Sequence, residues 1–233
     1  MRKIIMASAV AAAAALHWTG AWAQTSVSGN ITPAPASATP AAAPAAAMEV
    51  AGVKYDGQAE VAGQKLQLNG AGVRYKAIFR VYTAGLYLNS KAASTEAVLA
   101  NAGPKRIHIQ MLRDIDGEEL GKLFTKGMEQ NATRDEFGRG INGVLRMADI
   151  FVQKKKLTTG ESFGVDYIPG TGTVVFVNGK AMPGDPIKEV EFFNMLLKIW
   201  LGKSPADDGL KSALLGGGTA RPTSSRNAAG SSR

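Results

Sequence analysis

Alternation of apolar and polar residues marks the first part of the folded region as β-structure. Short alternating runs broken by glycine occupy residues 50–72 and predict hairpins. Residues 78–90, rich in aromatic and other β-forming side chains, predict a central strand. A further strand is predicted over residues 105–112, KRIHIQML, with its two isoleucines on one face and His108 on the other.

Helical spacing of apolar residues follows. Residues 117–131 and 134–153 each carry an apolar stripe at helical spacing, which predicts two amphipathic helices. Two or three strands around an Asn-Gly turn are predicted over residues 161–182. Asp185 and Pro186 are expected to cap and open a last long helix that is apolar nearly all round its second half.

The order of these segments indicates the fold class. Strands come first, then a helical layer, then more strands and a final helix, as in α+β proteins whose antiparallel sheet carries helices mostly on one face. We expect one domain over residues 49–215. Residues 24–48 consist mainly of Ala, Pro, Ser and Thr and are expected to form a disordered linker. Residues 216–233 are equally poor in core-forming side chains and are expected to be a disordered tail.

The first 23 residues have the layout of a secretory signal peptide. Arg2 and Lys3 precede an apolar run that is too short to span a membrane, and the run is followed by Ala21-Trp22-Ala23. We therefore expect cleavage after Ala23 and a periplasmic or secreted protein. A retained N-terminal anchor is the alternative, and the absence of cysteine excludes a lipoprotein anchor.

Composition narrows the possible chemistry. The chain has no cysteine, so it has no disulfide or thiolate, and cleavage after Ala23 would leave His108 as its one histidine. A histidine-based metal cluster or a Ser-His-Asp triad is therefore not expected, and neither is a cofactor. We expect His108 to be a half-exposed side chain of its strand rather than a catalyst.

The positive charge does not indicate a nucleic-acid-binding protein. The formal net charge is +8, and loss of Arg2 and Lys3 would leave +6, with 25 basic residues against 19 acidic ones. The basic residues are spread along the chain. Their one tight run, residues 154–156, is expected to be the solvated end of a helix rather than a phosphate-binding patch.

Residues 138–143 match the dinucleotide-binding pattern G-x-G-x-x-G. That pattern binds phosphate only where it joins a strand to the start of a helix, and here it lies inside a helical stripe. We expect these glycines to serve close helix packing instead.

Arg74 and Tyr82 raise the question of a shared site. They have the same parity, so both can face the same way in a sheet, but one unbroken strand would separate them by about 26 Å, at ~3.3 Å for each residue. They can share a site only if the chain reverses within residues 75–78. Gly70 and Gly72 allow an unusual backbone just before that point, but no glycine marks the reversal itself. Spacing alone favours a surface role for Arg74.

The same stretch resembles a known family. The pieces LNGAGVR (residues 68–74) and VYTAGLYL (residues 81–88) are similar to motifs of the chalcone isomerase-like family. That family includes plant chalcone isomerases, plant fatty-acid-binding relatives and exported bacterial members, and the order of elements over residues 49–215 agrees with it. The resemblance implies an open-faced β-sandwich, a large antiparallel sheet backed by helices, with the ligand cleft between the two layers.

The resemblance also implies roles for particular residues. The family's ligand-binding arginine falls on Arg74 and its hydroxyl residue on Tyr82, where the fatty-acid-binding branch has tyrosine and true isomerases have threonine. The remaining polar residues of the isomerases would fall near Leu120 and Gly127 and on Ile199, which cannot donate side-chain hydrogen bonds. The resemblance therefore favours a shared site at Arg74 and Tyr82 without the hydrogen-bond network of an isomerase.

We interpret the chain as an exported protein of this fold that binds a small amphipathic acid, such as a fatty acid or another carboxylate or phenolate. Arg74 would pair with the anion, Tyr82 would donate a hydrogen bond, and apolar residues around Ile199 and Trp200 would hold the tail. The alternatives are an isomerase, an intramolecular lyase acting on a chalcone or flavonoid, and an envelope scaffold without a ligand. The sequence identifies no protein partner.

Overall fold

The structure is a computed structural model that describes residues 46–218. The predicted signal peptide (residues 1–23), residues 24–45 of the predicted linker and residues 219–233 of the predicted tail lie outside the described residues. Met48, assigned to the linker above, is the first residue of strand β1.

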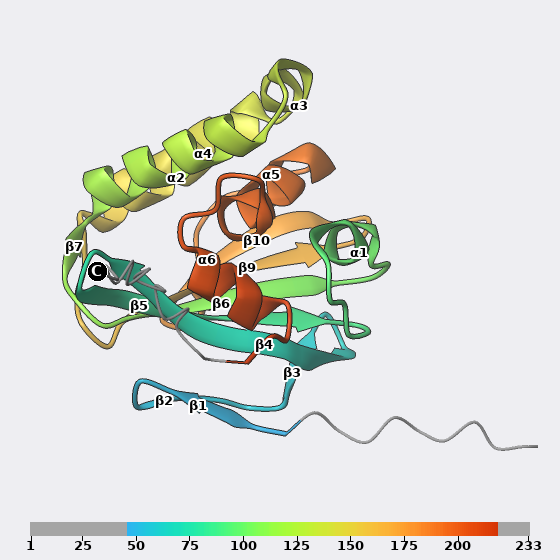
Figure 1. Ribbon diagram of the computed structural model, residues 1–233. Helices are drawn as coiled ribbons and strands as arrows, with labels where there is room; N and C mark the ends of the chain where they lie inside the picture. Colours follow the sequence, from blue (N-terminus) through green and yellow to red (C-terminus); the bar gives the residue numbers. More distant parts are fainter. Residues whose placement is uncertain (1–45, 219–233) are drawn as a thin grey trace, which may run out of the picture. The chain divides into compact units, whose positions relative to one another are not determined.

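A seven-stranded antiparallel sheet carries the fold (Figure 1), with the strand order β11-β10-β9-β6-β5-β4-β3. Its strands are β3 (Gln58–Val61), β4 (Gln64–Lys76), β5 (Phe79–Leu88), β6 (Lys105–Met111), β9 (Ser162–Ile168), β10 (Gly172–Val177) and β11 (Lys180–Ala181). Two short antiparallel pairs accompany it, β1 (Met48–Val50) with β2 (Val53–Tyr55) and β7 (Ile115–Asp116) with β8 (Lys156–Leu157).

The helices lie on one side of this sheet, and the β1–β2 hairpin lies on the other (Figure 1). They are α1 (Thr95–Ala100), α2 (Gly117–Asn131), α3 (Arg134–Arg139), α4 (Ile141–Lys154), α5 (Val190–Leu201) and α6 (Asp208–Leu214). This arrangement confirms the predicted α+β architecture, an open-faced antiparallel sheet backed by a helical layer.

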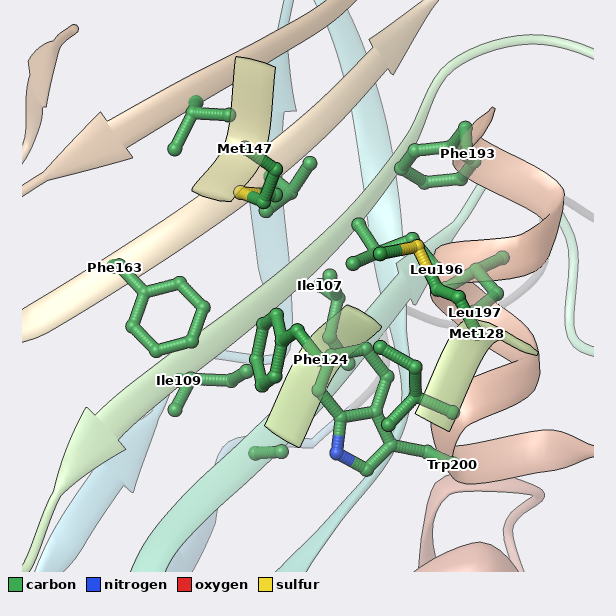
Figure 2. Packing of buried hydrophobic residues seen from close by; sticks show 14 of the residues in the cluster. Ile107, Ile109, Phe124, Met128, Met147, Phe163, Phe193, Leu196, Leu197 and Trp200 are labelled. Atoms are coloured by element: carbon green, nitrogen blue, oxygen red, sulfur yellow. The ribbon is translucent and has the colours of Figure 1, made fainter. Parts of the chain in front are cut away.

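The main core fills the space between the sheet and the helices. Phe124 of α2 lies between Phe163 and Trp200 in Figure 2, with ring centroids 5.6 Å and 5.5 Å apart. Helix α5 is buried on nearly every side, as expected for a helix that is apolar nearly all round. The core therefore holds Trp200 of α5 firmly, and this residue supports the site described below.

The opposite face of the sheet carries a smaller core under the β1–β2 hairpin. The Tyr55 hydroxyl donates to Thr83 Oγ1 at 2.7 Å, and the Tyr55 ring lies over Gly85, where a side chain would overlap it. His108 packs edge-on against the same ring, with centroids 6.1 Å apart, and burial lowers its pKa. These contacts place His108 as a half-buried packing residue, in line with its expected role.

Two predicted helices differ from the structure. The helix expected to open at Pro186 begins only at Val190, and Asp185 does not cap it. The reason is Ile187, whose backbone exchanges hydrogen bonds of 2.7 Å and 2.9 Å with Thr173 and so continues the sheet. The stripe over residues 134–153 is divided into α3 and α4.

The division between α3 and α4 falls at Gly140. A side chain at Gly140 would overlap Met195 of α5, and a Cβ at Gly143 would lie 2.5 Å from Phe192 Cγ. These two glycines of the G-x-G-x-x-G pattern thus allow close helix packing, as expected. A Cβ at Gly138, by contrast, would meet nothing within 4 Å.

Candidate functional site

The β4–β5 hairpin brings the two predicted ligand-binding residues together. Strand β4 ends at Lys76 and β5 begins at Phe79, and Ala77 adopts a left-handed conformation with φ of 54°. The chain therefore reverses within the required segment, and Arg74 is the direct register partner of Tyr82. No glycine marks this turn, because an alanine accepts the positive φ that glycine usually provides.

A β-bulge next to this pair turns adjacent side chains toward one space. The register passes from Arg74–Tyr82 to Tyr75–Arg80, which leaves Val81 as an extra residue on β5. Neighbouring residues of a regular strand point to opposite faces, whereas Val81 and Tyr82 here line the same cleft.

The cleft lies between the end of this hairpin, helix α2 and the segment before α6. Its volume is about 780 Å³, within the usual range of small-molecule sites. Much of its wall is apolar, with contributions from Val81, Leu120, Leu123, Phe124 and Ile199. Arg74 and Tyr82 lie in the wall at the sheet side.

Tyr82 is buried, and its oxygen is occupied by a donor. Trp200 Nε1 donates a hydrogen bond of 2.8 Å to the Tyr82 hydroxyl. An indole N–H can only donate, so the phenolic O–H must point elsewhere, and no residue within 46–218 accepts it. Burial raises the pKa of Tyr82 to about 12, so this hydroxyl remains a protonated donor at neutral pH.

Trp200 itself does not line the cleft. It is fully buried, donates to the Tyr82 hydroxyl and packs edge-on against Phe124 (Figure 2). Of the four residues predicted to bind the ligand, Arg74, Tyr82 and Ile199 therefore lie in the wall, and Trp200 positions the hydroxyl of one of them.

Among residues 46–218, Arg74 has one carboxylate within 4 Å, that of Asp207. Its Nη1 lies 3.9 Å from Asp207 Oδ2, which is beyond hydrogen-bond distance. Asp207 is the N-cap of α6, and its carboxylate also accepts from the backbone N–H of Leu210 at 2.8 Å and of Tyr75 at 3.0 Å. Asp207 is thus tied to the backbone at two points, and the guanidinium retains donors for another anion.

Gly70 and Gly72 explain why Asp207 lies beside Arg74. Neither glycine has a positive φ, so the unusual backbone that the sequence allowed is not what they provide. Helix α6 packs directly on β4 at these positions: a side chain at Gly70 would overlap the Ala213 carbonyl, and a Cβ at Gly72 would lie 2.6 Å from Ala213 Cβ. The glycines let α6 approach the strand, and this approach sets Asp207 next to Arg74.

The positions that correspond to the polar residues of the isomerases also lie in the cleft wall. Leu120, Gly127 and Ile199 all line it, and a Cβ at Gly127 would lie 3.1 Å from Ile199 Cγ2. These three positions therefore offer no side-chain hydrogen bond to a ligand.

Sequence reasoning missed Asp207 at this site. Its capping role could have been inferred from the sequence PADDGLKS, but its place beside Arg74 depends on a contact between segments far apart in the chain. Within residues 46–218, no group of His, Cys, Asp or Glu residues could hold a metal ion. No helix in that range has the length and apolar character needed to cross a bilayer.

Comparisons with known proteins agree with this architecture. A family model described as chalcone isomerase-like matches residues 47–216. A solved structure of a fatty-acid-binding protein from Arabidopsis thaliana superposes with a TM-score of 0.53 at 14% sequence identity, covering 70% of this chain and 92% of that one. Comparison with curated protein sequences gave no match. The structural likeness at this identity concerns the fold.

Proposed function

Because the chain belongs to the chalcone isomerase-like family, we propose that it binds a small amphipathic acid, such as a fatty acid, in the cleft beside Arg74 and Tyr82. The structural neighbour from Arabidopsis thaliana, a fatty-acid-binding protein, supports this class of ligand. The proposal includes export, which the sequence of residues 1–23 supports.

The observation that carries the proposal is that two donors, Arg74 and Tyr82, lie side by side on the sheet side of a cleft whose wall also holds a cluster of apolar side chains. A carboxylate oxygen near Arg74 could accept from the guanidinium and from the free O–H of Tyr82. Hydrogen bonds to charged groups contribute about 1.5–3 kcal/mol each. The site therefore offers a strong anchor for one acidic group.

The apolar wall would hold the rest of the ligand. Leu120, Phe124 and Ile199 present only hydrocarbon to the cleft. Burying one methylene group contributes about 0.8 kcal/mol, so affinity should rise about fourfold with each added methylene until the cleft is filled. A long acyl chain fits this wall better than a polyhydroxylated flavonoid does.

Titration calorimetry of the full chain with palmitate tests the anchor. Arg74→Ala should weaken binding about 10- to 150-fold, because the charge-assisted hydrogen bonds are lost. Tyr82→Phe should weaken it less, because the guanidinium remains. Arg80→Ala is the matched control: this exposed arginine belongs to the same hairpin but does not line the cleft, so affinity should stay unchanged. Equal affinities of Arg74→Ala and wild type would refute the proposal.

In the same titration, the variant Asp207→Asn should bind palmitate more tightly than the wild type. The Asp207 carboxylate competes with a ligand for Arg74, and asparagine removes that charge. Its one amide oxygen can still accept from Leu210 N–H and cap α6, while the hydrogen bond from Tyr75 N–H is lost. Ion pairs of this kind are worth about 0.2–1 kcal/mol, so palmitate binding should tighten about 1.5- to 5-fold.

A spectrophotometric assay with hydroxychalcones should show no cyclisation above the uncatalysed rate, since Leu120, Gly127 and Ile199 offer no polar network.

A further inference from the structure

Exposed apolar side chains gather where the cleft opens. Ile78 and Phe79, at the tip of the β4–β5 hairpin, are 77% and 52% exposed, and Leu123 of α2 is 43% exposed. Phe79 and Leu123 also line the cleft. Single exposed apolar residues are common on protein surfaces, but a group at the mouth of a binding cleft marks an interaction site.

Cations without carboxylate partners surround this group. Arg80, Arg113 and Lys126 are exposed, and within residues 46–218 none of them has a carboxylate oxygen within 4 Å. The Arg113 guanidinium lies 4.5 Å from the centroid of the Phe79 ring, so charge and apolar surface are in direct contact.

Each acidic residue that lines the same cleft already forms an ion pair with a lysine. Glu119 lies 3.8 Å from Lys76 Nζ, and Asp114 lies 2.8 Å from Lys156 Nζ. The three unpaired cations therefore give the mouth an excess of positive charge. This combination is complementary to an anionic lipid surface, whose headgroups attract cations and whose interior accepts apolar side chains.

We propose that the hairpin tip, Ile78 and Phe79, together with Leu123, docks on an anionic lipid bilayer. Arg80, Arg113 and Lys126 contact the headgroups, and the mouth of the cleft faces the acyl chains. Docking in this way would let an amphipathic acid pass between the bilayer and Arg74, a purpose that rests on the proposed function; the docking itself does not.

Co-sedimentation of the full chain with vesicles tests the surface. The protein should bind vesicles of phosphatidylcholine mixed with phosphatidylglycerol, bind those of phosphatidylcholine alone far more weakly, and be released as salt rises. Ile78→Ser should lower partition about tenfold and Arg80→Ala about fivefold. Neither residue lines the cleft, and both are exposed, so each variant should melt like the wild type.

Two control variants remove an exposed apolar side chain and an exposed cation at positions away from the mouth of the cleft. Leu145→Ser changes a residue on α4 that is 58% exposed, and Lys65→Ala removes an exposed cation at the opposite end of β4. Both variants should partition like the wild type. An equal loss in the controls, or no loss in Ile78→Ser and Arg80→Ala, would overturn the proposal. Absence of vesicle binding by the wild type would also overturn it and leave a protein partner as the occupant of this surface.

The two proposals fail in different ways. Arg74→Ala should lose affinity for soluble palmitate and bind anionic vesicles like the wild type, whereas Ile78→Ser should keep its palmitate affinity and bind anionic vesicles about tenfold more weakly. Transfer of a pyrene-labelled fatty acid out of vesicles should be slowed by either change. Wild-type vesicle binding by Ile78→Ser refutes the docking surface alone, and wild-type palmitate affinity of Arg74→Ala refutes the ligand site alone.

Discussion

At the scale of single residues, Trp200 determines what Tyr82 can do. The indole N–H donates to the Tyr82 oxygen, so the phenolic proton points away from the indole and is left for the cleft. Removing the hydroxyl would leave the buried indole N–H without an acceptor, which costs about 1–3 kcal/mol. One hydrogen bond thus links the stability of the core to the polarity of the cleft.

This link predicts a distinctive response to alkaline pH. Burial raises the pKa of Tyr82 from 10.0 to about 12, so between these values the unfolded chain releases a proton that the folded chain keeps. The free energy of unfolding should fall through this window by about 1.4 kcal/mol for each pH unit from this tyrosine alone. Other buried tyrosines, Tyr55 and Tyr87, add to the fall, because burial raises their pKa values as well.

Tyr82→Phe isolates the contribution of this residue. The variant should be less stable than the wild type by about 1–3 kcal/mol at neutral pH, but its stability should fall less steeply above pH about 10. Urea unfolding at a series of pH values measures both curves. Parallel curves would mean that Tyr82 titrates alike in the folded and unfolded chains.

At the scale of elements, the contact of α6 with β4 connects packing to the site. Gly72 lies under Ala213 of the helix, and Asp207 caps the same helix beside Arg74. Gly72→Ala should lower the free energy of unfolding by about 1–3 kcal/mol through overpacking and shift Asp207 away from Arg74. Gly138→Ala is the matched control: its Cβ would meet nothing within 4 Å, and alanine should stabilise α3 by up to about 1 kcal/mol. Urea unfolding measures the free energy of unfolding of both variants. Equal changes in the two would argue against close packing of α6 on Gly72 as the cause.

The sequence predicted these elements better than it predicted their contacts. The strand over residues 105–112, the helix over residues 117–131 and the packing role of Gly140 and Gly143 follow from local periodicity and composition, and the structure agrees. The β4–β5 turn has no glycine signal, since Ala77 takes the strained φ. Helix α5 begins at Val190 and not at Pro186 as predicted, because Ile187 pairs with Thr173. Contacts of this kind form only when distant segments meet, and propensity does not encode them.

At the scale of the whole molecule, the fold class and the family follow from the sequence, and the completed site does not. The order of strands and helices was enough to predict an antiparallel sheet backed by helices. The resemblance placed Arg74 and Tyr82 together, whereas spacing alone favoured a surface role for Arg74. Asp207 and the exposed apolar hairpin tip depend on how the finished chain is packed.

Export is the prediction that concerns the chain as a whole. The basic start, apolar run and Ala21-Trp22-Ala23 predict removal of residues 1–23, which lie outside the described residues. N-terminal sequencing of protein from the cell-envelope fraction should begin at Gln24. A chain that still begins at Met1 in that fraction would favour the retained anchor instead.

The capping of α6 by Asp207 has a consequence for the growing chain. Asp207 follows Tyr75, whose backbone it binds, by 132 residues, and synthesis proceeds from the N-terminus. A nascent chain that has reached the end of α5 already contains Arg74, Tyr82 and Trp200, yet it lacks the helix that supplies the counter-charge. Until α6 docks, Arg74 lacks this counter-charge and the cleft lacks the wall formed by the segment before α6, so the site is complete only when the last helix of the domain is in place.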